Sequence, residues 1–284
     1  MKNKIKIAYL GPKATFSHQA AIKLFDSNHK LIPAKNLEEV FKLTRDKKCH
    51  KAIIPIENSN AGTVSDILNI FCRKDYKLKI TNELFLKINF HLLSNEKNIK
   101  NIKLIYAHPM AIQQCNNWLK KNLKNIKIEK VNSNSIAAKL SSENKNTGAI
   151  SNELSSEVYK IPILKNKIQD YDDNTTRFLV LANKTTGSTR NDKTSLLFSL
   201  KHKSGVLYKF LEPLAKKKIN LIKIESRIMR IPIKNKINWE YHFFLDIEGH
   251  KDDKKIKEAL QEMRKHCLKL KILGSYPRGV TPWK

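Results

Sequence analysis

Apolar residues follow two different periods in the first two thirds of the chain. Compact or alternating apolar runs with the character of strands occur at 4–10, 51–56 and 102–109. Between them, apolar residues recur every three or four positions, as at 17–25 and 135–143, which predicts helices. Strands that alternate with helices indicate an α/β fold with parallel sheets.

Four polar segments stand at the ends of these predicted strands. They lie at 11–17, 57–63, 107–109 and 174–178, and the third leads into one predicted helix at 110–121. In α/β sheets, ligands bind where strand ends feed loops and helix N-termini. We therefore expect these segments to form a ligand pocket.

The pattern changes after residues 183–193, a charged segment rich in Gly, Ser and Thr that we interpret as a linker. Beyond it the predicted order is strand, helix, strand, strand, helix, strand, which is the ferredoxin-like plan. The first of these helices is predicted at 205–218 and the second at 252–267, with Asp252 near its N-cap.

The composition is that of a globular protein with free cysteines. Hydrophobic residues make up 40% of the 284 residues, and no apolar run approaches the roughly 18 residues of a membrane span. The N-terminus lacks the apolar core of a secretion signal. The four cysteines are scattered, without the spacing of a zinc site. We expect free thiols in the cytoplasm, no metal and no membrane partner.

The formal net charge of +29 does not by itself predict nucleic-acid binding. Lysines are spread over the whole chain among Asn and Ile, whereas nucleic-acid-binding proteins concentrate basic residues in a stripe, an arm or a module. We expect no nucleic-acid partner, and steeply salt-dependent binding to DNA or RNA would contradict this. A cationic field does attract small anionic substrates.

Seven short motifs follow one another along the chain. Each alone is weak evidence for a protein family, whereas their order and spacing together are strong evidence. They lie at 9–21, 54–68, 106–119, 174–178, 204–214, 219–227 and 238–247. Together they resemble the prephenate dehydratase family with a C-terminal ACT regulatory domain, nearly from end to end.

This resemblance implies the domains. We expect a two-lobed, periplasmic-binding-protein-like catalytic domain with parallel sheets at 1–182 and a ferredoxin-like βαββαβ ACT domain at 194–276. Lobe one is expected at about 1–85 and 170–182, and lobe two at about 86–169. Because a strand begins almost at the N-terminus, we expect no chorismate mutase domain of the kind fused to some relatives.

The resemblance also implies the reaction, in which prephenate loses water and carbon dioxide to give phenylpyruvate in L-phenylalanine biosynthesis. Such an enzyme is a carbon–oxygen lyase and needs no cofactor. Negative charge develops on the departing ring oxygen, so a proton or a strong hydrogen-bond donor has to meet it. A dimer or tetramer assembled through ACT domains is expected.

In the motif at 174–178, the resemblance gives Thr176 the essential role of donor to the departing hydroxyl. The plain alternative is a β-branched residue that starts a strand. Arg177 either counters a substrate carboxylate or pairs with a neighbouring acid.

The motif at 54–68 supplies Glu57, Asn58 and Ser59. Asn58 is predicted to be catalytic and to donate to substrate oxygens. Ser59 is predicted to bind the substrate, and Ser59 or Thr63 can cap the following helix. Glu57 is counted with the catalytic residues, but in a supporting role, because a carboxylate near a dianionic substrate is repulsive unless it is paired or protonated. A plain turn would use the same residue types.

Four further side chains are predicted to reach the substrate. Gln114 is predicted to be catalytic and to bond the substrate's carboxylate or hydroxyl. His108 is either a substrate contact or merely a helix-entry residue, and Thr15 and Ser17 are either ligand donors or caps.

Three positions of the expected catalytic domain depart from the family pattern. Ala107 replaces the usual Ser and Met110 the common Gln, which removes polar contacts. Ala14 occupies a usual Gly position, where a turn needs positive φ.

In the ACT domain, the resemblance implies an allosteric phenylalanine site formed by Gly205, Val206 and Leu207 with Glu225, Ser226 and Arg227. Val206 stands where the family usually has Ala and Ile228 where it has Pro, so weakened feedback inhibition is expected. The alternative to an enzyme is a non-catalytic two-lobed small-molecule sensor with an ACT domain, but retention of Thr176 favours the enzyme.

Overall fold

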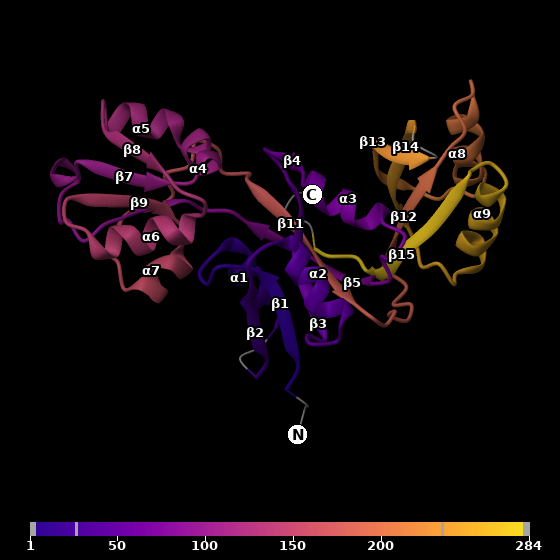
Figure 1. Cartoon of the computed structure of the whole chain (residues 1–284), viewed down its shortest axis with the longest axis horizontal. Coiled ribbons are helices and arrows are strands. Elements are labelled where there is room, and N and C mark those ends of the chain that lie inside the picture. The colour runs from indigo at the N-terminus through magenta and orange to yellow at the C-terminus, as the bar shows by residue number, and fades with distance from the viewer. Residues whose placement is uncertain (1–3, 26–27, 234–235, 281–284) are drawn as a thin grey trace. The chain divides into compact units, whose positions relative to one another are not determined.

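The computed structural model describes residues 4–25, 28–233 and 236–280, without the side chains of 230–238 (Figure 1). The chain forms two compact units, and each is described by itself. Within the described residues, the first unit comprises 4–63 and 84–178, and the second comprises 64–83 and 179–280.

The first sheet has the strand order β2-β1-β3-β11-β5, with the short β4 paired to β3. Strands β1, β2 and β3 are parallel, as predicted, and β4 is antiparallel to β3. The strands are β1 (Lys6–Leu10), β2 (Lys30–Ala34), β3 (Lys51–Asn58), β4 (Gly62–Thr63), β5 (Lys79–Lys87) and β11 (Thr175–Ala182). The helices along this part of the chain are α1 (Phe16–Leu24), α2 (Leu37–Arg45) and α3 (Ser65–Cys72).

The inner strands of this sheet read as continuous apolar runs. Ile7, Ala8 and Tyr9 of β1 and Ile53 and Ile54 of β3 are fully buried. Parallel strands that are covered on both faces show this pattern. At the end of β3 and the start of β11, polar residues replace the apolar run.

The second sheet has the order β10-β6-β9-β7-β8. It is mixed, since β7 is parallel to β8 and β9 whereas β6 is antiparallel to β9 and β10. Its strands are β6 (His91–Leu93), β7 (Leu104–Ala107), β8 (Lys127–Lys130), β9 (Thr147–Ser151) and β10 (Ile163–Lys165). The helices are a 3₁₀ turn η1 (Ile99–Asn101), α4 (Pro109–Gln114), α5 (Asn116–Asn122), α6 (Asn134–Glu143) and α7 (Glu153–Tyr159).

The prediction of one helix at 110–121 is wrong, because the helix breaks at Cys115. Cys115 has φ −119° and ψ 17°, outside the helical region. The carboxylate of Asp170 accepts hydrogen bonds from the backbone N–H groups of Asn117 and Trp118 at 2.9 and 3.1 Å. Asp170 thus caps the start of a second helix, α5. Because Asp170 is far away in the sequence, the local spacing of apolar residues could not predict this contact.

Among the described helices, α1, α2, α6 and α7 begin at Ser, Thr or Asn N-caps whose side chains accept a backbone N–H in the first turn. These caps are Thr15 of α1, Asn36 of α2, Ser133 of α6 and Asn152 of α7. Local sequence chemistry therefore determines where these helices begin.

The second unit contains the predicted βαββαβ module, and its element order is confirmed. The antiparallel sheet has the order β13-β14-β12-β15, and α8 and α9 pack together against it (Figure 1). Leu196, Phe198, Phe210, Ile256 and Met263 form the centre of its core. The elements are β12 (Asp192–Ser199), α8 (Val206–Lys216), β13 (Leu221–Ile233), β14 (Lys236–Glu248), α9 (Lys254–Arg264) and β15 (Lys269–Pro277).

The N-cap of α9 is Asp253, so Asp252 lies next to the N-cap, as predicted. The basic segment between the motifs at 219–227 and 238–247 lengthens β13 and β14. Within the described part of the chain, every helix is too short or too polar to cross a bilayer.

Candidate active site

Asn58, the last residue of β3, joins its strand to the start of β11. Its side-chain Nδ2 donates to Oγ1 of Thr176 at 2.9 Å and to Oδ1 of Asn174 at 2.8 Å. Its Oδ1 accepts the backbone N–H groups of Asn60 and Ala61 at 3.0 and 2.9 Å. Asn58 and Thr176, two of the four predicted catalytic residues, are thus in direct contact.

Asn174 connects this pair to the third predicted catalytic residue. Its side chain is buried, and its Nδ2 donates to Oε1 of Gln114 at 2.6 Å. Gln114 ends α4, and its backbone carbonyl accepts the N–H of Asp170 at 2.7 Å. Thr176, Asn58, Asn174 and Gln114 therefore form one hydrogen-bonded network.

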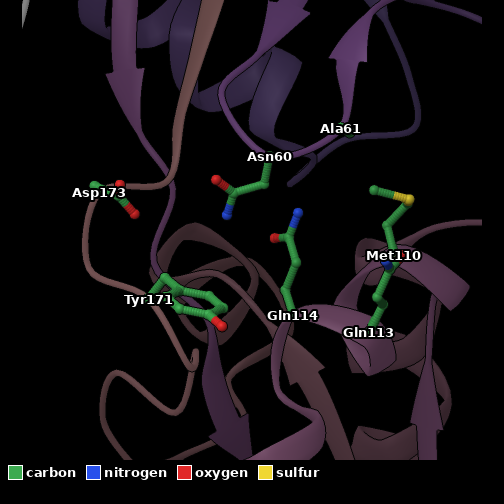
Figure 2. A pocket seen from close by; sticks show the side chains of 7 residues that line it. All are labelled: Asn60, Ala61, Met110, Gln113, Gln114, Tyr171 and Asp173. Carbon is green, nitrogen blue, oxygen red and sulfur yellow. The ribbon is translucent and has the colours of Figure 1, made fainter.

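A cavity of about 590 Å³ lies beside this network (Figure 2). Gln114 is the one residue of its lining that was predicted for the site. Figure 2 shows the amides of Asn60 and Gln114 extending toward one another from two different segments, with Tyr171 and Asp173 on a third. The lining residues are Asn60, Ala61, Met110, Gln113, Gln114, Tyr171 and Asp173.

The lining residues that the sequence did not single out are close neighbours of those that it did. Asn60 and Ala61 follow Ser59, and Asp173 precedes the motif at 174–178. Gln113 directly precedes Gln114 on α4, and Met110, already named as a departure from the family pattern, lies four residues before Gln114 on the same helix. Met110 puts an apolar side chain on the cavity wall.

Ser59 holds β11 instead of capping a helix. Its N–H donates to the carbonyl of Thr175 at 2.9 Å, and its Oγ accepts the N–H of Thr175 at 3.0 Å. The N-cap of α3 is Val64, without a side-chain cap. The prediction that Ser59 or Thr63 caps this helix is therefore wrong. Ser59 is instead hydrogen-bonded to Thr175 of β11.

Glu57 and Arg177 form an ion pair. Oε2 of Glu57 lies 3.6 Å from Nη1 of Arg177, whose side chain is 7% exposed. A buried guanidinium needs a paired charge, and Glu57 supplies it. Of the two roles considered for Arg177, the structure contains the pairing with a neighbouring acid.

His108 is the N-cap of α4. Its Nδ1 accepts the backbone N–H of Met110 at 3.2 Å, and burial lowers the pKa of its imidazole. Both observations favour a neutral ring in which Nδ1 is an acceptor, the behaviour of a helix-entry residue.

The turn before α1 holds Thr15 and Ser17. Thr15 caps the helix by accepting the N–H of His18 at 3.3 Å, and Ser17 lies buried in the first turn. Ala14 has φ 65°, the left-handed conformation expected where the family has Gly. An alanine there costs on the order of 1 kcal/mol. Hydrogen bonds from Asn152 and Ser155 to its carbonyl hold the turn.

The predicted allosteric residues lie on two elements of the βαββαβ module. Gly205 is the N-cap of α8 with φ 74°, and Val206 and Leu207 begin that helix and pack against the core. Glu225, Ser226 and Arg227 lie on β13 at the end of the strand order. Oε2 of Glu225 is 3.5 Å from Nζ of Lys223.

Comparison with known proteins agrees with this arrangement. A family model described as prephenate dehydratase matches residues 7–186, and one described as ACT domain matches 194–264. A bifunctional chorismate mutase/prephenate dehydratase of Aquifex aeolicus is 41% identical over 280 residues, which are 99% of this chain and 75% of that protein. A prephenate dehydratase of Methanocaldococcus jannaschii is 34% identical over 280 residues, 95% of this chain and 97% of that protein.

A solved structure has the same fold over nearly the whole chain. The prephenate dehydratase of Arthrobacter aurescens, determined in complex with L-Phe, superimposes with a TM-score of 0.86 at 27% identity. The match covers 96% of this chain and 90% of that one. The chain therefore belongs to the prephenate dehydratase family and carries its C-terminal ACT domain.

Proposed function

We propose that this chain removes water and carbon dioxide from prephenate, with Thr176 as the donor that meets the departing ring hydroxyl. Membership of the family makes the chain a dehydratase, a carbon–oxygen lyase. The observation that carries the role of Thr176 is the hydrogen bond from Nδ2 of Asn58 to its Oγ1.

The direction of this bond supports the role. Because the Thr176 oxygen accepts from Asn58, its own hydrogen is available for another acceptor. Donation into the oxygen also polarises the O–H bond, so the hydroxyl becomes a better donor. A donor aimed at a departing oxygen stabilises the charge that develops there. Loss of the carboxylate then makes the ring aromatic.

Asn58 acts by positioning Thr176. Its Nδ2 has three acceptors within 3.3 Å, namely Asn174, Thr175 and Thr176. With its amide so engaged, Asn58 holds the hydroxyl of Thr176 in place. Glu57 and Arg177 support the same corner by joining β3 to β11 through their ion pair.

We extend the proposal to regulation and assembly. The relative from Arthrobacter aurescens binds L-Phe. In this chain Gly205 and Glu225 mark the corresponding motifs, and phenylalanine is the proposed effector. The exposed apolar side chains of Ile224 and Ile228 on β13, and of Trp239 and Tyr241 on β14, support a homo-oligomer formed through ACT domains. The four free thiols support a cytoplasmic location.

Incubation of the purified chain with prephenate tests the proposal. Phenylpyruvate is expected to accumulate with the wild-type chain, and Thr176→Ala is expected to lower kcat at least about a hundredfold. Thr176→Ser, which keeps the hydroxyl, is expected to retain a measurable share of activity. A Thr176→Ala variant at the wild-type rate contradicts the role, and binding without turnover indicates the non-catalytic sensor instead.

A further inference from the structure

We propose that Asn174 is a positioning residue that orients the amide of Gln114, so that Gln114 offers N–H groups and not its oxygen to the substrate. The inference rests on the proposed dehydratase function. It concerns a residue outside the catalytic set, because Asn174 is buried and acts through Gln114.

The orientation of the first amide in the network follows from the backbone. Two N–H groups, those of Asn60 and Ala61, point at one side-chain atom of Asn58 at 3.0 and 2.9 Å. An amide oxygen accepts two such bonds, whereas an NH₂ group accepts none. The atom that receives them is therefore Oδ1, and the NH₂ group of Asn58 faces Asn174.

The same logic passes to the next two amides. Two NH₂ groups cannot bond to each other at 2.8 Å, so the atom of Asn174 that faces the NH₂ group of Asn58 is Oδ1. The remaining NH₂ group of Asn174 then needs an acceptor, and the Gln114 atom at 2.6 Å is Oε1. Each amide fixes the next, and amide orientations are properly assigned from such networks.

The consequence falls on the cavity. With Oε1 engaged by Asn174, the Nε2 group of Gln114 is the part left for a ligand, and Gln114 lines the cavity (Figure 2). Its main chain is held as well, by the bond from the Asp170 N–H. The substrate atom that meets Gln114 is thus a hydrogen-bond acceptor, an oxygen of a carboxylate, keto or hydroxyl group.

Exchange of Asn174 for Asp separates the two sides of the residue. Asp still accepts from Asn58, so the Asn58–Thr176 pair keeps its geometry, but it cannot donate to Gln114. The Gln114 amide is then expected to turn and present Oε1 to the substrate. We expect kcat/KM to fall at least about tenfold, because an amide oxygen would then face a substrate oxygen where the wild-type chain donates a hydrogen bond.

A double-mutant cycle with Gln114→Ala identifies the route of the effect. If Asn174 acts through Gln114, Asn174→Asp is expected to change kcat/KM less than about threefold when Gln114 is already Ala. Asn174→Leu adds no charge but removes both contacts, so with Gln114 present it is expected to lower kcat/KM at least as much as Asn174→Asp. Asn122→Asp, the same exchange at an exposed helix end, is the matched control and is expected to leave kcat/KM unchanged.

Each other outcome overturns the proposal. Equal losses in both backgrounds show that Asn174 acts through Asn58 or through folding, and an active Asn174→Asp variant shows that it does not act at all. A loss confined to Asp and absent in Leu is a charge effect. If the wild-type chain does not convert prephenate, the proposed function fails. The same double-mutant cycle is then measured by calorimetry, with the affinity for phenylpyruvate in place of kcat/KM. Absence of phenylpyruvate binding also overturns the inference.

Discussion

Nζ of Lys193 lies 2.9 and 3.0 Å from the two carboxylate oxygens of Glu83, and both side chains are almost completely buried. The backbone N–H of Gly279 donates to the same carboxylate at 2.9 Å. Removal of one partner of such a pair leaves an uncompensated buried charge. We expect Lys193→Met to lower the unfolding free energy by about 3–5 kcal/mol, measured by urea or thermal unfolding.

Lys251→Met is the matched control for this prediction. Lys251 pairs with Asp252, whose side chain is 66% exposed, and exposed ion pairs contribute at most about 1 kcal/mol. The double variant Lys193→Met, Glu83→Leu is expected to recover much of the lost stability, since no unpaired charge remains. A Lys193→Met variant as stable as the Lys251→Met variant would contradict the assigned importance of the buried pair.

The hydrogen bond from Asn58 to Thr176 gives the second prediction. In Asn58→Asp the side chain cannot donate, so the Thr176 hydroxyl turns to donate to Asp and no longer offers its hydrogen to the substrate. We expect kcat to fall by about a hundredfold or more, with a smaller change in KM, because the lost interaction belongs to the transition state. Steady-state kinetics with prephenate measure both constants. A rise in KM at constant kcat would instead assign Asn58 to ground-state binding.

The sequence could predict the parts of the site that are coded locally. The ends of β3 and β11 were recognisable because polar residues interrupt apolar runs there, and Asn58 and Thr176 were identified from their motifs. Caps such as Thr15 were visible from residue type. The βαββαβ order followed from apolar periods alone, without any knowledge of strand pairing.

The contacts that join distant segments could not be read in the same way. Asn174 lies 116 residues from Asn58 and 60 from Gln114, and no local pattern shows that their amides meet. Asp170 breaks the helix at 110–121 from outside it. Ser59 looked like a helix cap because Ser is a common cap, but its partner is Thr175 on another strand.

The third prediction separates the cap role of His108 from a role in proton transfer. Asn is a good N-cap and cannot titrate, so His108→Asn is expected to keep both stability and kcat. His108→Ala removes the acceptor for the Met110 N–H and is expected to lower the unfolding free energy by about 1 kcal/mol. Thermal unfolding and the prephenate assay check both variants. A large loss of kcat in His108→Asn would show that the ring takes part in the chemistry.

Regulation gives the fourth prediction, which follows from Val206 at the start of α8. Its side chain is bulkier than the Ala usual in the family, where the ligand is proposed to pack. We expect phenylalanine to inhibit the wild-type chain weakly and Val206→Ala to strengthen inhibition by about tenfold, the effect of one or two methyl groups on the binding free energy. Activity measured against phenylalanine concentration tests this. Strong micromolar inhibition of the wild-type chain would contradict it.

The fifth prediction concerns pH and the imidazole of His18, which stacks on Tyr9 with ring centroids 4.7 Å apart. Its Nδ1 accepts the N–H of Ala14 at 3.0 Å. Burial, and secondarily the charge of Lys13, lower its pKa from the ordinary value of 6.5. In the window between the lowered pKa and 6.5, the unfolded chain binds more protons than the folded one. Stability is therefore complete above about pH 6.5 and falls as the pH decreases through that window.

The size of this effect is bounded by the number of protons involved. One additional proton in the unfolded state changes the unfolding free energy by at most about 1.4 kcal/mol per pH unit. His18→Asn keeps an acceptor for the Ala14 N–H but cannot titrate, so we expect a smaller loss of stability between pH 7.5 and 5.5 than in the wild-type chain. The other histidines with lowered pKa, His91, His108 and His242, keep their contribution in both proteins. Equal pH slopes for the two proteins would show that His18 is protonated to the same extent in the folded and unfolded states.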